Sequence, residues 1–395
     1  MKAQRLLLPL ALFSGHCFAN SVQQALQDTQ VKLNFRYRLE QVNPDNTQET
    51  ALASTLRSRV ALQTGAWQIA DSQAVKALVE YDNVSSIGGE TYNTTTNSNT
   101  GYATVADPTG TDLNVAALLY SVGDSTLVTL GRQRVNLLNQ RFVGSVGWRQ
   151  NEQTFDGIRL EQKFNSQWQL DVASLHNANR VFGPSGSTAD LHGRFNTAQL
   201  GWSITPKHAV TGFVIDLDFD TLASRSSRTS GLDYQGGIDA WKWQLSVAKQ
   251  QDAHQAPTDV DTNYHRFEAS YAFSKVTVKA WQERLGSDGS NAFQTPLATL
   301  HAFQGFADLF LTTPSQGLRE NALQVLVPIN TVKTTISYHQ FDADVGDAKL
   351  GSEWDATVSY DLTKNLQLLG KVAFYNADSF QVDTNKFWLM ATYQL

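Results

Sequence analysis

The chain has 395 residues, of which 41% are hydrophobic and 10% aromatic, and Asp and Glu outnumber Lys and Arg by 37 to 31. This composition is too polar for membrane-spanning helices: after residue 19 the longest apolar run, VAALLY at 115–120, is far shorter than the roughly 20 residues that a helical span needs. The acidic balance and the lack of a basic run argue against nucleic acid as a partner.

Residues 1–19 have the pattern of a cleaved export signal. Lys2 and Arg5 precede the apolar stretch LLLPLALF, and the small residue Ala19 offers a cleavage position. The only cysteine, Cys17, lies inside this segment, so the mature chain is expected to form no disulfide and no thiolate metal site. We therefore expect an exported bacterial envelope protein whose residues 20–395 form a single domain.

Beyond residue 30, apolar and polar residues alternate in segments about ten residues long. In VKLNFRYRLEQV, residues 31–42, Leu33, Phe35 and Tyr37 share one face while Arg36 and Arg38 share the other. Such a period of two is typical of a strand with one apolar and one polar face. About 18 segments of this kind begin near residues 32, 54, 73, 112, 125, 153, 167, 194, 208, 230, 241, 263, 275, 319, 331, 350, 365 and 386. An even number suits a closed barrel.

The connections between these segments alternate between tight and long. The tight ones include TGAWQ, GDS, TPKH, SK and DLTKN, and the long polar ones cover 84–111, 132–152, 176–193, 219–229, 250–262 and 285–318. This alternation predicts an all-β fold, a transmembrane antiparallel barrel of the bacterial outer membrane with short periplasmic turns and long extracellular loops. A secreted array of β-sandwiches or a β-helix would also show alternating residues, but it does not require alternating loop lengths.

Aromatic residues gather near both ends of the predicted strands, as expected for belts at the two lipid headgroup levels. The belt at the short turns contains Trp67, Trp168, Trp202, Trp241, Trp243, Phe273, Tyr360 and Tyr393, and the opposite belt contains Tyr81, Phe219 and Phe374. We expect the outer surface to contact membrane lipid and lipopolysaccharide. The last strand, KFWLMATYQL, is expected to engage the barrel-assembly machinery.

A barrel of this size leaves a lumen too wide for side chains to fill, which predicts the passage of solutes through water. The inward positions of the strands carry both signs of charge, including Arg57, Arg59, Lys76, Arg159 and Glu80. Most of these charges are expected to pair across neighbouring strands, and the remainder to set selectivity by concentrating ions of opposite sign.

The segment GRQRVNLLNQRFVGSVGWRQNEQTFDGIRLE, residues 131–161, resembles the corresponding segment of the alginate-export family of outer-membrane porins. The shared features are a GRQ strand end, an R-x-x-G-x-x-x-W-R loop and an F-D-G-x-R-L strand start. FRYRLE, HAFQGFADLFLTTPSQGLRE at 301–320 and GSEWDATVSYDL at 351–362 are similar to other parts of that family. The resemblance implies an 18-stranded barrel whose long loops fold inward and whose lumen is an arginine-lined path for an anionic polymer.

Arginine suits such a solute because a guanidinium group binds a carboxylate through two parallel hydrogen bonds and stays charged at any relevant pH. Trp148 and Phe142 either stack against sugar rings or anchor the loop to the wall. The candidates for the substrate path and its constriction are Arg57, Arg59, Lys76, Arg132, Arg134, Arg141, Trp148, Arg149 and Arg159. We predict a passive channel for anionic solutes, acidic polysaccharides or oligosaccharides such as alginate, with no catalytic residue and no cofactor.

Two other classes of function stay open, a non-channel adhesin or structural barrel and a barrel enzyme that acts on envelope glycans or lipids. Acids cluster in FDADVGDAKLGSEWD at 341–355 and in DLDFD at 216–220, and His339 lies close to the first cluster, which suits a calcium site or a hydrolase. The chain contains no G-x-S-x-G, no H-E-x-x-H and no complete EF-hand loop, and its eight His show no ligand spacing. We therefore predict neither an enzyme nor a metal site.

Overall fold

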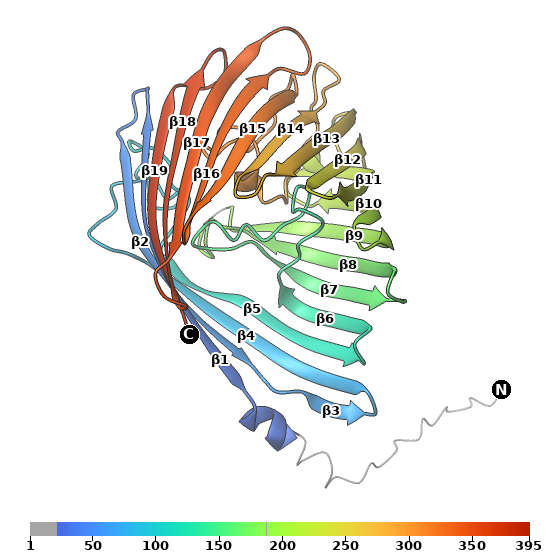
Figure 1. Cartoon of the computed structure of the whole chain (residues 1–395). Coiled ribbons are helices and arrows are strands. Elements are labelled where there is room, and N and C mark those ends of the chain that lie inside the picture. Colours follow the sequence, from blue (N-terminus) through green and yellow to red (C-terminus); the bar gives the residue numbers. More distant parts are fainter. Residues whose placement is uncertain (1–21, 187) are drawn as a thin grey trace, which may run out of the picture.

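A computed structural model of the chain describes residues 22–186 and 188–395, and it consists of an antiparallel sheet that closes on itself (Figure 1). The first strand, β1 (Gln30–Pro44), pairs with the last, β19 (Thr384–Gln394), and thereby completes the barrel. The predicted export signal, residues 1–19, lies outside the described residues. No helix among the described residues is long and apolar enough to cross a membrane.

The strands follow one another around the wall in chain order. They are β2 (Ala51–Gln63), β3 (Trp67–Ala70), β4 (Gln73–Ser86), β5 (Gly110–Val122), β6 (Thr126–Gln133), β7 (Thr154–Lys163), β8 (Trp168–Asn179), β9 (Asp190–Thr205), β10 (His208–Phe219), β11 (Ser227–Ile238), β12 (Trp241–Asp252), β13 (Asp261–Ala272), β14 (Thr277–Leu285), β15 (Leu318–Ile329), β16 (Val332–Asp342), β17 (Lys349–Asp361) and β18 (Leu366–Ala377). Two short 3₁₀ helices, η1 (Ala223–Arg225) and η2 (Leu300–Ala302), lie in the long loops.

The predicted 18-stranded barrel is confirmed, because β2 and β3 both pair with β4 and act as one interrupted wall strand. The expected turn at TGAWQ is wrong: residues 64–66 interrupt this strand, and the turn follows at 71–72. A helical segment at 22–27 packs against the interruption. The Gly65 amide donates a hydrogen bond of 2.8 Å to the Ala25 carbonyl, and a Cβ at residue 65 would lie 2.7 Å from the Cβ of Asp28.

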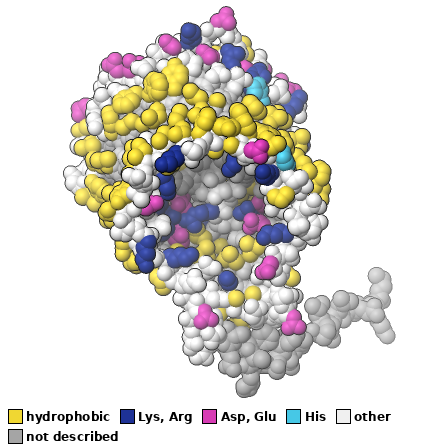
Figure 2. Space-filling model, in the orientation of Figure 1, with side chains coloured by type: hydrophobic (Ala, Val, Ile, Leu, Met, Phe, Trp, Pro, Cys, Tyr) yellow, Lys and Arg dark blue, Asp and Glu magenta, His cyan; other side chains and the backbone are white. Residues whose placement is uncertain are grey.

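Side chains alternate between the lumen and the outer face along each strand, as a pleated strand requires. In β1, Arg36, Arg38 and Glu40 are buried inside the barrel, whereas Phe35 and Tyr37 are exposed on the outer face. Figure 2 shows hydrophobic side chains over much of the outer wall and charged side chains of both signs gathered in a hollow of the barrel. The wall is thus apolar toward lipid and charged toward the lumen.

Exposed aromatic side chains mark the end of the barrel that carries the short turns, among them Trp202, Trp241 and Phe273. The assignment of Phe219 to the opposite outer belt is wrong. Phe219 is buried and its ring lies 4.8 Å from that of Phe195. The inner face of β10 is apolar at alternate positions, so Phe219 points inward into a hydrophobic cluster of loop and wall residues.

Candidate functional site: the loop-constricted lumen

The loop at residues 134–153, here called the constriction loop, folds into the barrel and is held by the inner faces of β1 and β2. The Arg36 guanidinium donates to the Gly147 carbonyl and to the Gln150 side-chain oxygen, both at 2.9 Å. The Gln150 amide nitrogen donates to the Thr55 hydroxyl at 2.9 Å. The inward bend that the resemblance implies is therefore present, and polar wall side chains fix it.

The loop at residues 286–317, here called the second loop, lies against the constriction loop inside the lumen. Val143 and Leu297 form a parallel β-bridge, and the Gln153 side-chain nitrogen donates to the Leu297 carbonyl at 3.0 Å. Gly305, at φ +79°, sits over the carboxylate of Glu353, where a Cβ would collide with it. The two loops thus form one internal body that narrows the barrel.

The rings of Trp148 and Phe142 are engaged with protein groups. Trp148 stacks on His301 at 4.4 Å with an interplanar angle of 6°, and the Arg38 guanidinium lies 4.4 Å from its ring centroid. Phe142 packs in the hydrophobic cluster, 4.9 Å from the ring of Phe213. These contacts favour the anchoring alternative for both rings over stacking on a sugar.

Arg149 of the constriction loop is bound by two carboxylates, one from the wall and one from the second loop. It donates to Glu40 of β1 at 3.1 Å and to Asp308 of the second loop at 2.9 Å. The neighbouring Arg38 donates to Asp107 at 2.9 Å. Burial raises the pKa of Asp107, but Arg38 and Arg149 beside it more than offset this and hold the pKa below its ordinary value. In this network two guanidinium groups face three carboxylates.

A second network surrounds Glu152. Glu152 accepts hydrogen bonds from Arg59 at 2.7 Å and from Arg134 at 2.5 Å, and Arg57 lies 3.7 Å away. Arg59 also makes a two-pronged bond to Asp82, at 2.5 and 2.6 Å. Burial raises the pKa of Glu152, but the adjacent arginines prevail and lower it to about 2. The structure therefore brings Arg57, Arg59 and Arg134 together.

The remaining candidate residues lie apart from these two networks. Arg141 binds Glu283 of β14 at 2.7 Å, and Arg159 binds Asp171 of β8 at 2.6 Å. Lys76, on the inward face of β4, forms no ion pair within the part of the chain that the structure describes. Arg132 shares the outer face of β6 with the exposed Leu130, and it pairs there with Asp156. Arg132 consequently does not join the other arginines in the lumen.

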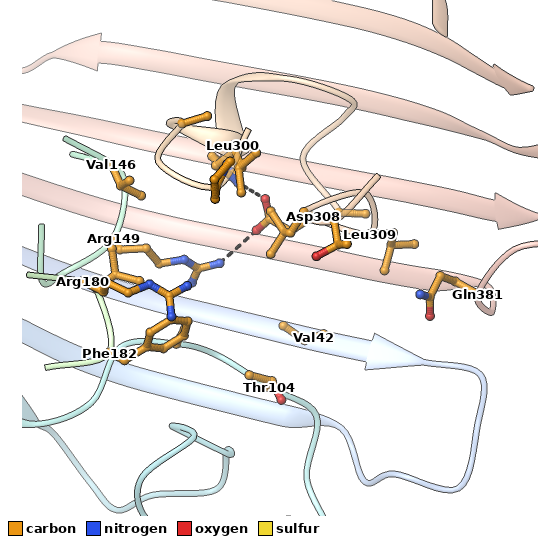
Figure 3. Close-up of a pocket in the computed structure, with 18 of the residues that line it drawn as sticks. Val42, Thr104, Val146, Arg149, Arg180, Phe182, Leu300, Asp308, Leu309 and Gln381 are labelled. Atoms are coloured by element: carbon orange, nitrogen blue, oxygen red, sulfur yellow. Dashed lines mark hydrogen bonds and ion pairs between the residues drawn. The ribbon is translucent and has the colours of Figure 1, made fainter. Parts of the chain in front are cut away.

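Two cavities flank the constriction loop. The outer cavity, of about 570 Å³, is lined by residues of the long loops, including Val146, Arg149 and Gln153 of the constriction loop (Figure 3). The inner cavity, of about 600 Å³, lies toward the short turns and is lined by Asn136 and Leu138 of the same loop. The constriction loop therefore separates an external vestibule from a periplasmic one.

The two cavities carry opposite charge. The charged residues lining the outer cavity are Arg149, Arg180, Arg225, Lys386 and Asp308. Those lining the inner cavity are Arg159, Lys163, Asp124, Glu161, Asp171 and Asp233. Cations thus outnumber acids outside the constriction, and acids outnumber cations inside it.

His301 of η2 lies at the edge of the outer cavity and does not add to its charge. Burial lowers its pKa to about 3, so the ring is neutral. In that state Nδ1–H donates to Asp308 at 2.7 Å, and Nε2 accepts from the Lys371 ammonium at 2.6 Å. Among the described residues, no group of three or more His, Cys, Asp and Glu could hold a metal ion.

Comparisons with known proteins agree with this architecture. Residues 27–322 match the family model described as alginate export. A search of curated proteins finds no match. Similar solved structures include OccK9 (OpdG) of Pseudomonas aeruginosa, at 15% identity and a TM-score of 0.74 over 94% of this chain and 99% of that one. OccAB4 of Acinetobacter baumannii is 11% identical with a TM-score of 0.73, over 93% of this chain and 98% of that one.

A third solved structure, of Pseudomonas aeruginosa OpdK with vanillate, has a TM-score of 0.70 at 12% identity, over 94% of this chain and 99% of that one. At these identities the solved structures show a shared fold. The family match covers well over half of the chain, which shows the family. The chain belongs to the alginate export family and is a porin-like channel of the bacterial outer membrane rather than an enzyme.

Proposed function

We propose that the barrel passes anionic solutes by diffusion and that acidic oligosaccharides, such as fragments of alginate, are the preferred class. One observation carries this proposal: the outer cavity, which a solute meets first, presents four cationic residues and a single carboxylate, and two of the cations, Arg180 and Arg225, form no ion pair with any described residue. Fixed charge in a cavity with low-dielectric walls raises the local concentration of ions of opposite sign. The alginate export family, to which the chain belongs, supports an acidic sugar as the solute.

The arginine networks beside the constriction loop support the same proposal. Arg59 and Arg149 are each held in place by two or more protein carboxylates. A solute carboxylate bound there would replace one of these carboxylates and meet a guanidinium that is already oriented. The cavities, at about 570 and 600 Å³, lie in the range typical of small-ligand pockets. This size favours short oligomers or an extended chain over a bulky folded polymer.

Planar bilayers containing the purified full chain test the proposal. In a KCl gradient, the reversal potential should show anion preference, and alginate oligomers should reduce the current. Cation preference without block by the oligomers would overturn the solute assignment. Absence of any conductance, with heat-modifiable gel migration showing a folded barrel, would support a structural or adhesive barrel instead.

A further inference from the structure

We propose that the outer cavity contains an anion-capture site formed by Arg180 and Arg225, and that it takes carboxylates carried on a ring. This inference rests on the proposed function and deepens it, because it names the residues that first bind the solute and the chemistry that they select. Unlike the other cations that line the cavity, these two arginines form no ion pair with a described residue.

Among the residues that the structure describes, neither Arg180 nor Arg225 has a carboxylate as a partner. Neither forms an ion pair with any residue in the described ranges, 22–186 and 188–395. Arg180 donates one long hydrogen bond, of 3.4 Å, to the Thr188 carbonyl, and its guanidinium lies 4.5 Å from the Phe182 ring centroid. Burial alone lowers the pKa of both arginines, with no acid contributing, and a guanidinium stays charged even so.

The other cations of the cavity are already neutralised. Arg149 is bound by Glu40 and Asp308, and Lys386 lies 3.6 Å from Asp308. An incoming carboxylate would have to displace these protein acids, whereas it could bind Arg180 or Arg225 without displacing anything. Binding to an unpaired guanidinium gives two charge-assisted hydrogen bonds without that cost.

Apolar groups beside these arginines give the site its preference for rings. Phe182, Leu222, Leu309 and Leu311 line the same cavity. In Figure 3, Arg180 and Phe182 lie at one side of the cavity and Leu309 lies at the other. A ring-bearing carboxylate matches this arrangement, since its charged end can meet a guanidinium while its ring packs on apolar side chains. Uronic acids and aromatic acids share this chemistry.

Current block in planar bilayers tests the site, with probes added to the side of the long loops. The probes are benzoate, a uronic acid disaccharide, and benzamide as the uncharged counterpart of benzoate. In the variant Arg180→Gln with Arg225→Gln, the half-blocking concentration of an effective carboxylate should rise about tenfold, as expected from the loss of charge-assisted hydrogen bonds. Arg180→Lys with Arg225→Lys should restore part of the block.

The matched control is Arg194→Gln with Arg228→Gln, because these arginines are largely exposed, with side chains 74% and 62% exposed, and do not line the cavity. Block by benzoate alone, by the disaccharide alone, or by both supports the site and identifies its ligand. Equal block by benzamide, or an unchanged half-blocking concentration in the cavity variant, overturns it. If anion preference persists in that case, the proposed function stands without this site, whereas cation preference of the unmodified channel overturns both.

Discussion

Most of the lumen arginines bind carboxylates of the same chain, so a solute carboxylate has to replace one of these to reach a guanidinium group. Arg59 is bound by Asp82 and Glu152, and Arg149 by Glu40 and Asp308. Removal of one member of such a buried pair leaves the other charge without compensation. The effect of an arginine substitution therefore includes the carboxylates that it exposes as well as the cation that it removes.

Replacement of Arg59 and Arg149 by alanine should turn the channel toward cations. The substitutions remove two positive charges and leave the carboxylates around them unpaired. Since lumen charges create potentials of several kT, the ratio of anion to cation permeability should fall by roughly an order of magnitude. Reversal potentials in a KCl gradient measure this ratio. The control pair Arg194→Ala with Arg228→Ala should leave it unchanged, and an unchanged ratio in the lumen variant would show that this loop does not set selectivity.

Glu152 should make the constriction loop sensitive to acid. Its pKa is about 2 in the folded chain and about 4.5 when unfolded, so its contribution to stability is complete above pH 4.5 and is lost as the pH falls toward 2. This shift corresponds to about 3 kcal/mol. The difference in unfolding free energy between the unmodified chain and Glu152→Gln should shrink by that amount from pH 5 to pH 2, as measured by urea titration in lipid vesicles. A difference that stays the same from pH 5 to pH 2 would show that Glu152 is not the group that ties the loop to its arginines.

At the scale of elements, the two inward loops behave as part of the wall rather than as mobile flaps. The Gly144 amide donates to the Leu297 carbonyl at 2.9 Å, and the Thr299 amide donates to the Gln140 carbonyl at 3.0 Å. Val143 and Leu297 are both buried in the hydrophobic cluster. Solutes are therefore expected to pass beside the loops while these stay in place.

A disulfide between Val143→Cys and Leu297→Cys tests whether the loops move. The two residues face each other in a parallel β-bridge, and the only natural cysteine lies in the predicted export signal. Oxidation should leave the KCl conductance within about twofold of the reduced state, because contacts at this seam already fix the loops. A large, reversible drop on oxidation, absent from the Val143→Cys single variant, would show that the loops separate during conduction.

The strands could be predicted from the sequence because alternation is a local property. The predicted starts near residues 73, 208 and 241 coincide with those of β4, β10 and β12. The break at 64–66 could not be foreseen, since it accompanies a contact between Gly65 and the helical segment at 22–27 that no local pattern shows. Similarly, Phe219 looked like a lipid-facing residue because the inward loops that cover it are far away in sequence.

The sequence predicts several of the arginines that belong to the candidate site, but it does not predict which carboxylates pair with them. Arg141, Arg149 and Arg134 were found through the resemblance, and they do lie in an inward loop. Their carboxylate partners are between 18 and 159 residues away, so no local pattern shows them. Arg180 and Arg225 were missed because each is an isolated cation in a polar loop, and only the fold shows that both line one cavity.

At the scale of the whole molecule, the barrel is a closed support that brings distant loops to one axis. Pairing of β1 with β19 leaves no open edge, so lipid meets apolar side chains all around the wall. The constriction loop lies between an outer cavity rich in cations and an inner cavity rich in acids. The charge of the lumen therefore changes sign along its length.

This reversal of sign should make the channel rectify current. When the periplasmic side is positive, anions enter through the cationic end and cations through the acidic end, so both accumulate and conductance rises. When the periplasmic side is negative, anions and cations are both drawn out of the lumen, so both are depleted there and conductance falls. Current–voltage curves in about 0.1 M KCl should therefore be asymmetric, and the asymmetry should fade near 1 M KCl, where the Debye length shrinks from about 10 Å to about 3 Å.

Arg180→Gln with Arg225→Gln should weaken this asymmetry, and the exposed pair Arg194→Gln with Arg228→Gln should not. A symmetric curve at low salt in the unmodified channel would contradict the bipolar arrangement. With cations at the outer end of the lumen and acids at the inner end, the barrel conducts as a diode. The sign of the membrane potential then raises or lowers its conductance without any movement of the loops.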